Sequence, residues 1–197
     1  MSKQYILDNL IKQNNGYLIT SEAIDCGVSK TYLMEYVRKM DLIREAQGVY
    51  CTQETWPDTL YIIHLRNKQV CFSHETALYL HGLMDREPSK VTITAKEGYN
   101  ASHLKSQGIV VHKVKADKFS LGITQIPTPY GHMVRTYDRE RVICDIIKGK
   151  NKMDIQIFQT AIKQYISDHN KNLSNLMRYA DMLGVSDRVK TYMEVLL

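Results

Sequence analysis

A run of four side chains at Ser29–Tyr32 offers hydrogen-bonding chemistry at the start of an expected helix. The run supplies two hydroxyls, an ammonium and a phenol. An α-helix fits the major groove of DNA, where the residues at its N-terminus reach the donors and acceptors on base edges. The residues that we expect to contact bases are therefore Ser29, Lys30, Thr31 and Tyr32.

Four further polar residues follow these candidates and suit contacts to phosphate. Arg38 and Lys39 lie later in the same expected helix, and Arg44 and Gln47 lie in the segment after it. Phosphate contacts fix the register of a protein on DNA without reading its sequence. The alternative is that this module serves protein contact alone.

Residue patterns typical of enzymes are few. Lys96 ends an expected strand, but Thr94 stands where a metal-dependent nuclease would carry an acidic residue. Ser73, His74 and Glu75 are of the nucleophile, base and acid types, yet adjacent residues on one helical turn cannot form a catalytic triad, and we expect Ser73 to cap a helix. Motifs for nucleotide binding and for hydrolysis are absent. We therefore expect no catalysis and no cofactor.

A metal site is not expected either. The four cysteines form no C-x-x-C pair, and a reducing compartment gives no reason to link them. His74 and His81 are seven residues apart and share a helix face, but two histidines without further ligands are better explained as structural.

The elements that would position the DNA-contacting residues are three helices and a hairpin. Apolar periodicity predicts a helix over residues 3–14 capped by Ser2, a short helix capped by Thr20, and a third capped by Ser29 with Leu33, Val37 and Met40 on its apolar side. Two short strands then flank a glycine-containing connection at 45–48. This order predicts a winged helix-turn-helix over residues 1–57.

Residues 58–197 are expected to form a second domain. Helices are expected at 58–67 and 73–82, strands at 91–95 and 109–114, and helices throughout from about 138 to 197. We expect Arg141 and Asp145 to form an i, i+4 pair worth a few tenths of a kcal/mol. The fold class is therefore α+β: a winged helix-turn-helix followed by a mixed domain, α+β to about 147, that ends in a helical segment.

Charge is unevenly distributed. The chain carries a formal net charge of +5, but residues 1–57 contain six basic and seven acidic residues. Since neutralising phosphates supplies much of the affinity of DNA-binding proteins, positive charge must come from elsewhere. We expect a supporting basic face in the second domain, and an ordinary solvated surface is the alternative. The candidates for this face are Arg66, Lys68, Lys113, Lys115 and Lys118.

The sequence contains no apolar segment long enough to cross a bilayer and no pattern of a secretory signal, so we expect a cytoplasmic protein. The last expected helix lacks a long heptad repeat. We therefore expect a monomer in solution that pairs on DNA.

Three segments carry a resemblance to a known family. Gly48-Val49-Tyr50, Phe72–Leu83 and Tyr137–Ile147, in this order and in a chain of this length, closely resemble the abortive-infection E antitoxins of bacterial type IV toxin-antitoxin systems. The resemblance covers nearly the whole chain.

The resemblance implies an antitoxin that binds inverted repeats in its own promoter, represses the operon cooperatively, and counteracts a co-encoded nucleotidyltransferase-like toxin without forming a stable complex. Two alternatives stay open. One is a stand-alone winged-helix transcription regulator whose second domain senses a ligand, and the other is a nucleic-acid-processing enzyme with an unfamiliar active site.

Overall fold

The computed structural model describes residues 2–196, except for the side chains of residues 195 and 196. The chain forms two compact units. The first unit comprises residues 1–68 and 130–132, and the second comprises residues 69–129 and 133–197. The boundary expected after Pro57 therefore differs from this division, which assigns fourteen more residues to the first unit, namely 58–68 and 130–132. Leu197, the end of the expected helical segment, lies outside the described residues.

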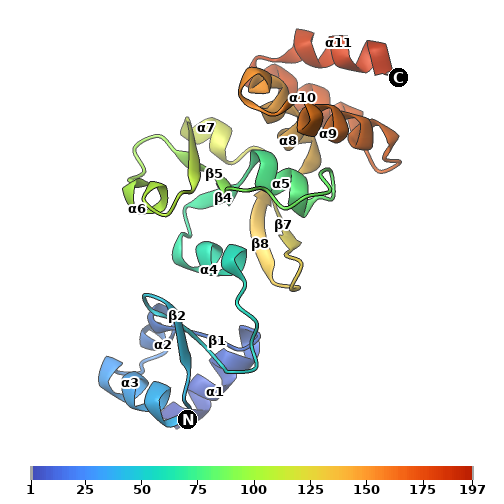
Figure 1. Cartoon of the computed structure of the whole chain (residues 1–197). Coiled ribbons are helices and arrows are strands. Elements are labelled where there is room, and N and C mark those ends of the chain that lie inside the picture. Colours follow the sequence, from blue (N-terminus) through green and yellow to red (C-terminus); the bar gives the residue numbers. More distant parts are fainter. Residues whose placement is uncertain (1, 197) are drawn as a thin grey trace. The chain divides into compact units, whose positions relative to one another are not determined.

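The first unit combines four helices with a three-stranded antiparallel sheet of order β1-β3-β2 (Figure 1). Its elements within the described residues are α1 (Lys3–Gln13), β1 (Tyr17–Ile19), α2 (Thr20–Asp25), α3 (Lys30–Lys39), β2 (Ile43–Ala46), β3 (Val49–Cys51) and α4 (Thr59–Arg66).

Two of the three expected caps in this unit are confirmed. The hydroxyls of Ser2 and Ser29 accept hydrogen bonds from the backbone N–H groups three residues later. The cap expected at Thr20 is wrong, because this residue already lies within α2 and Ile19 occupies the capping position without a side-chain bond. Ile19 pairs with Val49 in the sheet, so the end of β1 determines where α2 begins.

A cluster of aromatic rings joins α4 to the first unit. The Tyr17 hydroxyl accepts a hydrogen bond from the backbone N–H of Asp58 at 2.9 Å, and the Tyr17 and Tyr61 ring centroids are 5.2 Å apart. The Asp58 carboxylate caps α4 and lies 2.8 Å from Nδ1 of His132, whose ring stacks on Tyr61. These contacts explain why both α4 and the short segment around His132 belong to this unit.

The second unit is built around a mixed five-stranded sheet of order β6-β5-β4-β8-β7. The strands β4 and β8, like β5 and β6, are parallel, and the other neighbouring pairs are antiparallel. The strands are β4 (Val70–Phe72), β5 (Thr92–Lys96), β6 (Val110–Val114), β7 (Ile123–Pro127) and β8 (Met133–Tyr137).

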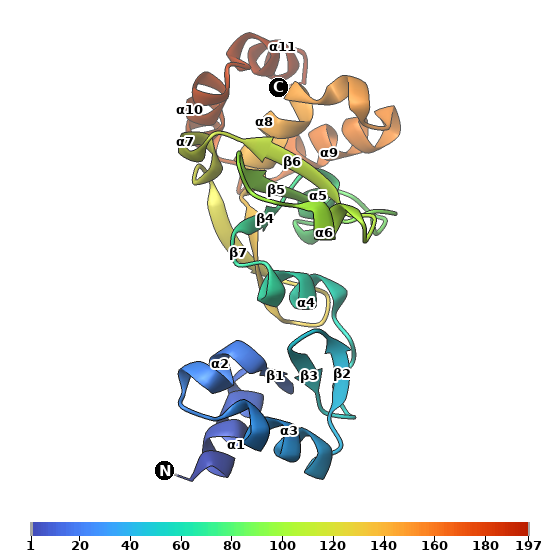
Figure 2. The same cartoon turned by 90° about the vertical axis from the view of Figure 1, so that its left-hand side faces the viewer.

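Helices cover this sheet and gather towards the end of the chain, where α8 to α11 pack together (Figures 1 and 2). The helical elements are α5 (His74–Leu80), α6 (Ser102–Lys105), α7 (Ala116–Phe119), α8 (Arg139–Lys148), η1 (Lys150–Lys152), α9 (Ile155–Ser167), α10 (Leu173–Leu183) and α11 (Ser186–Leu196). The α+β class is thus confirmed, as is the helical character of the C-terminal segment.

Helix α8 forms the centre of the second core. Its eight residues from Glu140 to Ile147 are all buried, because α5, α9, α10 and α11 surround it. Val142, Ile143, Ile146 and Ile147 form an apolar stripe on α8, and Asp138 caps the helix by accepting from the backbone N–H of Arg141. Among residues 2–196, none of the helices has the length and apolar character needed to cross a membrane.

Candidate nucleic-acid interface and a basic cavity

Helix α3 exposes the polar side that the sequence predicts. Ser29, Lys30 and Thr31 are exposed at its N-terminus, and Tyr32 is half-buried with the Lys3 ammonium 5.6 Å from its ring centroid. The opposite side carries Leu33, Tyr36 and Val37 into the core of the first unit. Met40 was expected on this apolar side but follows the last turn and is 45% exposed.

The other residues expected to contact phosphate are also exposed. Arg38 and Lys39 lie in the last turn of α3, Arg44 lies on β2, and Gln47 lies in the turn between β2 and β3. In that turn Gly48 has a φ of +76°, and a Cβ atom there would contact Thr20. The backbone conformation therefore favours glycine in this hairpin, whereas a Cβ atom 3.6 Å from Thr20 would make only an ordinary van der Waals contact.

The five residues expected to form one basic face of the second domain fall into two groups. Arg66 and Lys68 belong to the first unit, whereas Lys113, Lys115 and Lys118 belong to the second. The expectation was wrong for the first two because α4 packs with the first unit. Even with them, the first unit contains eight basic and eight acidic residues, so the net positive charge of the chain lies in the second unit.

The second unit contains a cavity of about 800 Å³ lined by α5, β5, β6, α8 and the segments around 84–90 and 148–157. Its lining includes Glu75, Glu87, Asp145 and Asp154 but is richer in basic residues. The six basic residues are Arg86, Lys90, Lys113, Lys118, Lys148 and Lys152.

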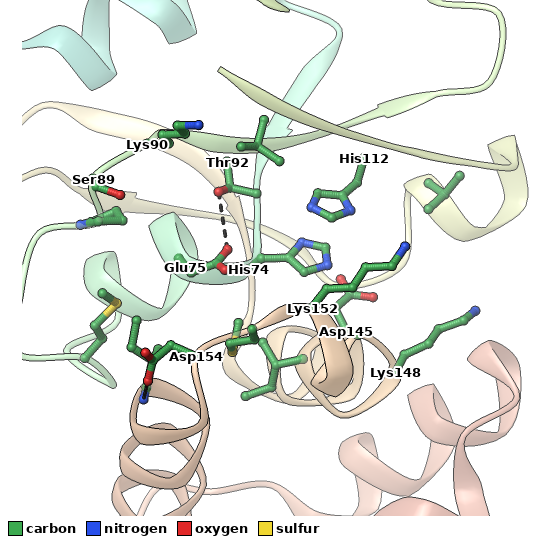
Figure 3. Close-up of a pocket in the computed structure, with 18 of the residues that line it drawn as sticks. His74, Glu75, Ser89, Lys90, Thr92, His112, Asp145, Lys148, Lys152 and Asp154 are labelled. Atoms are coloured by element: carbon green, nitrogen blue, oxygen red, sulfur yellow. Dashed lines mark hydrogen bonds between the residues drawn. The ribbon is translucent and has the colours of Figure 1, made fainter. Parts of the chain in front are cut away.

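Three of the four cavity carboxylates already have partners. Asp145 accepts from Arg141, Asp154 accepts from two backbone N–H groups at the start of α9, and Glu75 accepts from the Thr92 hydroxyl at 3.3 Å (Figure 3). Of the six cations, Lys148 donates to the Leu183 carbonyl oxygen at 3.2 Å. Only Asp145 is paired with a cation, so the six basic residues of the lining outnumber the three remaining carboxylates and its net charge is positive.

Two histidines lie side by side in the cavity wall. The rings of His74 and His112 stack with their centroids 3.7 Å apart (Figure 3). Burial lowers the pKa of His74 to about 3, with a further contribution from His112, and burial also lowers the pKa of His112. His74 has a φ of +47°, which lies in the left-handed region that residues other than glycine rarely adopt.

Sequence reasoning missed this cavity. It paired His74 with His81, but His81 instead bonds through Nε2 to the Tyr137 carbonyl oxygen at 2.7 Å. Ser73 precedes α5 without capping it, because its hydroxyl accepts from Thr94 and contacts His74 instead. The nearest signal in the sequence was the Ser73–Glu75 run, and nothing in the spacing connects it with residues beyond 110.

Arg141 lies outside the cavity lining and binds Asp145, which is one of the lining residues. The Arg141 side chain is fully buried, with Nε 3.1 Å from both carboxylate oxygens of Asp145 and Nη1 donating to the carbonyl oxygens of Lys118 and Leu121. Its guanidinium lies 4.2 Å from the Tyr137 ring centroid. The expected i, i+4 pair is therefore present, but the expected contribution of a few tenths of a kcal/mol is that of an exposed pair, whereas this pair is buried.

Comparison with known proteins identifies a shared fold. No family model matches the chain, and none of the curated proteins compared with it matches. Among solved structures, the chain is similar to the crystal structure of the RV2827C protein from Mycobacterium tuberculosis, with a TM-score of 0.58 and 12% sequence identity over 96% of this chain and 79% of that one. At this identity the similarity concerns the fold alone.

Proposed function

We propose that the first unit is a winged helix-turn-helix that binds DNA, and that the protein is an antitoxin of the abortive-infection E type that represses its own operon. The observation that carries the DNA-binding part is the exposed polar N-terminus of α3. Ser29, Lys30 and Thr31 are free of the core there, while the other side of the helix is anchored by Leu33 and Val37. A helix held in this way can enter the major groove without disturbing the unit.

The order of elements supports the same proposal. Three helices are followed by the β2–β3 hairpin, whose turn exposes Gln47, and Arg44 is exposed on β2. In this arrangement the hairpin serves as the wing, with Arg44 and Gln47 contacting the backbone of the DNA. The antitoxin part of the proposal rests on the resemblance of the three segments named above.

Replacing Lys30 and Thr31 together by alanine should weaken binding to the DNA upstream of the gene by about thirtyfold or more, because each lost base contact removes roughly 1–3 kcal/mol. Footprinting and gel-shift titration measure this. The matched control is Lys163→Ala, which removes an exposed charge from the second unit. Unchanged protection with the double variant would mean that α3 does not read the operator.

The balanced charge of the first unit leads to a second expectation. Reversing Lys113, Lys115 and Lys118 to glutamate should weaken DNA binding and lower the slope of log affinity against log salt by about three, if each contacts one phosphate. Three exposed lysines of the same unit, Lys105, Lys163 and Lys190, provide the control when reversed. Equal slopes for the two triple variants would assign the charge requirement to another surface.

The antitoxin part has its own test, which is growth during expression of the neighbouring gene. We expect that gene to encode a toxic nucleotidyltransferase-like protein, and co-expression of this chain to restore growth without a stable complex on size-exclusion chromatography. A harmless neighbouring gene would contradict the antitoxin proposal and leave DNA binding intact.

The cavity favours a second candidate function, a winged-helix regulator whose second domain senses a ligand. A space of about 800 Å³ falls in the size range of small-molecule sites. A ligand that changes operator affinity would favour this candidate over the antitoxin.

A further inference from the structure

The basic cavity of the second unit combines size, charge and preformed walls. Residues from α5, β5, β6 and α8 form its sides, so its shape depends on regular elements rather than on one loop. Its volume of about 800 Å³ is much larger than an isolated phosphate ion needs. A ligand that fills it must therefore be larger than a single phosphate ion.

The charged residues of the cavity indicate the sign of the ligand's charge. Lys90 and Lys152 are exposed, and their ammonium groups make no hydrogen bond with the described part of the chain. Three of the four carboxylates, in contrast, accept hydrogen bonds from neighbouring donors. Figure 3 shows Lys90 near Ser89 and Thr92, and Lys148 and Lys152 near Asp145. Cations that come from separate segments suit a ligand with more than one anionic group.

The histidine pair adds donors without adding charge. His74 and His112 lie within the cavity lining, and their low pKa values keep both rings neutral near neutral pH. A neutral imidazole carries one N–H donor. Anionic oxygens can thus be bound by ammonium groups and by imidazole N–H groups together.

From these observations we infer that the cavity binds a small ligand that carries a polyphosphate group. Ammonium groups act as point charges towards phosphate, and several of them can share the oxygens of a phosphate chain. Both a free polyphosphate and a nucleotide carry this group. The inference does not depend on DNA binding by the first unit.

The test is titration calorimetry of the full chain with inorganic triphosphate and, separately, with a nucleoside triphosphate. We expect the double variant Lys90→Gln, Lys152→Gln to weaken binding by about tenfold or more, since two charge contacts are lost. The matched control is Lys163→Gln, Lys190→Gln, which removes two exposed lysines of the same unit outside the cavity and should leave binding unchanged. Tighter binding of the nucleoside triphosphate would identify the ligand body as a nucleoside, and equal affinities would identify the phosphate chain as sufficient.

Three results would overturn the inference. The first is no binding of either probe at millimolar concentration, and the second is binding that both double variants weaken equally. The third is a Lys90, Lys152 variant that loses affinity for DNA but not for triphosphate, which would assign these lysines to DNA phosphates. Circular dichroism of each variant confirms that the fold is retained.

Discussion

Replacing Arg141 by methionine should lower the free energy of unfolding of the second unit by about 3–5 kcal/mol, the loss typical of breaking a buried ion pair. The substitution leaves the Asp145 carboxylate buried without its cation, and the Lys118 and Leu121 carbonyl oxygens lose their donor. Urea unfolding read by hydrogen exchange in segments of the second unit measures the loss.

The double variant Arg141→Met, Asp145→Leu distinguishes the stability lost through an unpaired buried charge from the stability lost through altered packing. It removes both partners, so we expect it to recover much of the stability that the single variant loses. The recovery is favoured because Nη2 of Arg141 is buried without a hydrogen-bond partner among the described residues, which weakens the intact pair. A double variant no more stable than Arg141→Met would show that the loss arises from packing or from the carbonyl oxygens.

Local signals in the sequence predicted the helices well where a residue close in the sequence supplies the stabilising group. Ser2, Ser29 and Asp138 each cap the helix they precede, because a side-chain oxygen reaches a backbone N–H three residues later without help from distant residues. Such a bond is determined by neighbours in the sequence. The apolar stripe of α8 was predictable for the same reason.

The predictions differed from the structure where a residue distant in the sequence binds the polar group in question. Ser73 occupies a capping position, but Thr94 on the neighbouring strand donates to its hydroxyl. The compact units differ from the boundary expected after Pro57, and Tyr17 binds the backbone N–H of Asp58 across 41 residues. Neither contact can be predicted from the local periodicity of the sequence.

The candidate sites differ in the same way. The exposed side of α3 follows from helical periodicity, so its residues could be chosen in advance. The cavity could not, because His74 meets His112 only when β6 lies parallel to β5 at the edge of the sheet. The burial of Arg141 also depends on packing, since an i, i+4 pair has the same spacing on a surface and in a core.

The stability of the second unit should fall as the pH falls below about 6.5. Burial lowers the pKa of His74, His81 and His112, and that of His74 reaches about 3. Below pH 6.5 the unfolded chain takes up protons at these rings while the folded unit resists them, so protonation favours unfolding. Above pH 6.5 both states hold neutral rings and the contribution is fully present. The loss for His74 continues until the pH reaches its folded pKa.

The variant His74→Asn isolates one of these rings. Asparagine tolerates the positive φ of this position but does not titrate. Between pH 7.5 and 5.5 one histidine with so low a folded pKa accounts for about 1.4 kcal/mol of the decrease in unfolding free energy. We therefore expect the decrease measured by urea unfolding to be smaller by about that amount in the variant than in the wild type. Equal decreases in the two proteins would mean that His74 accepts a proton freely in the folded unit, and the ring would then add a positive charge to the cavity as the pH falls.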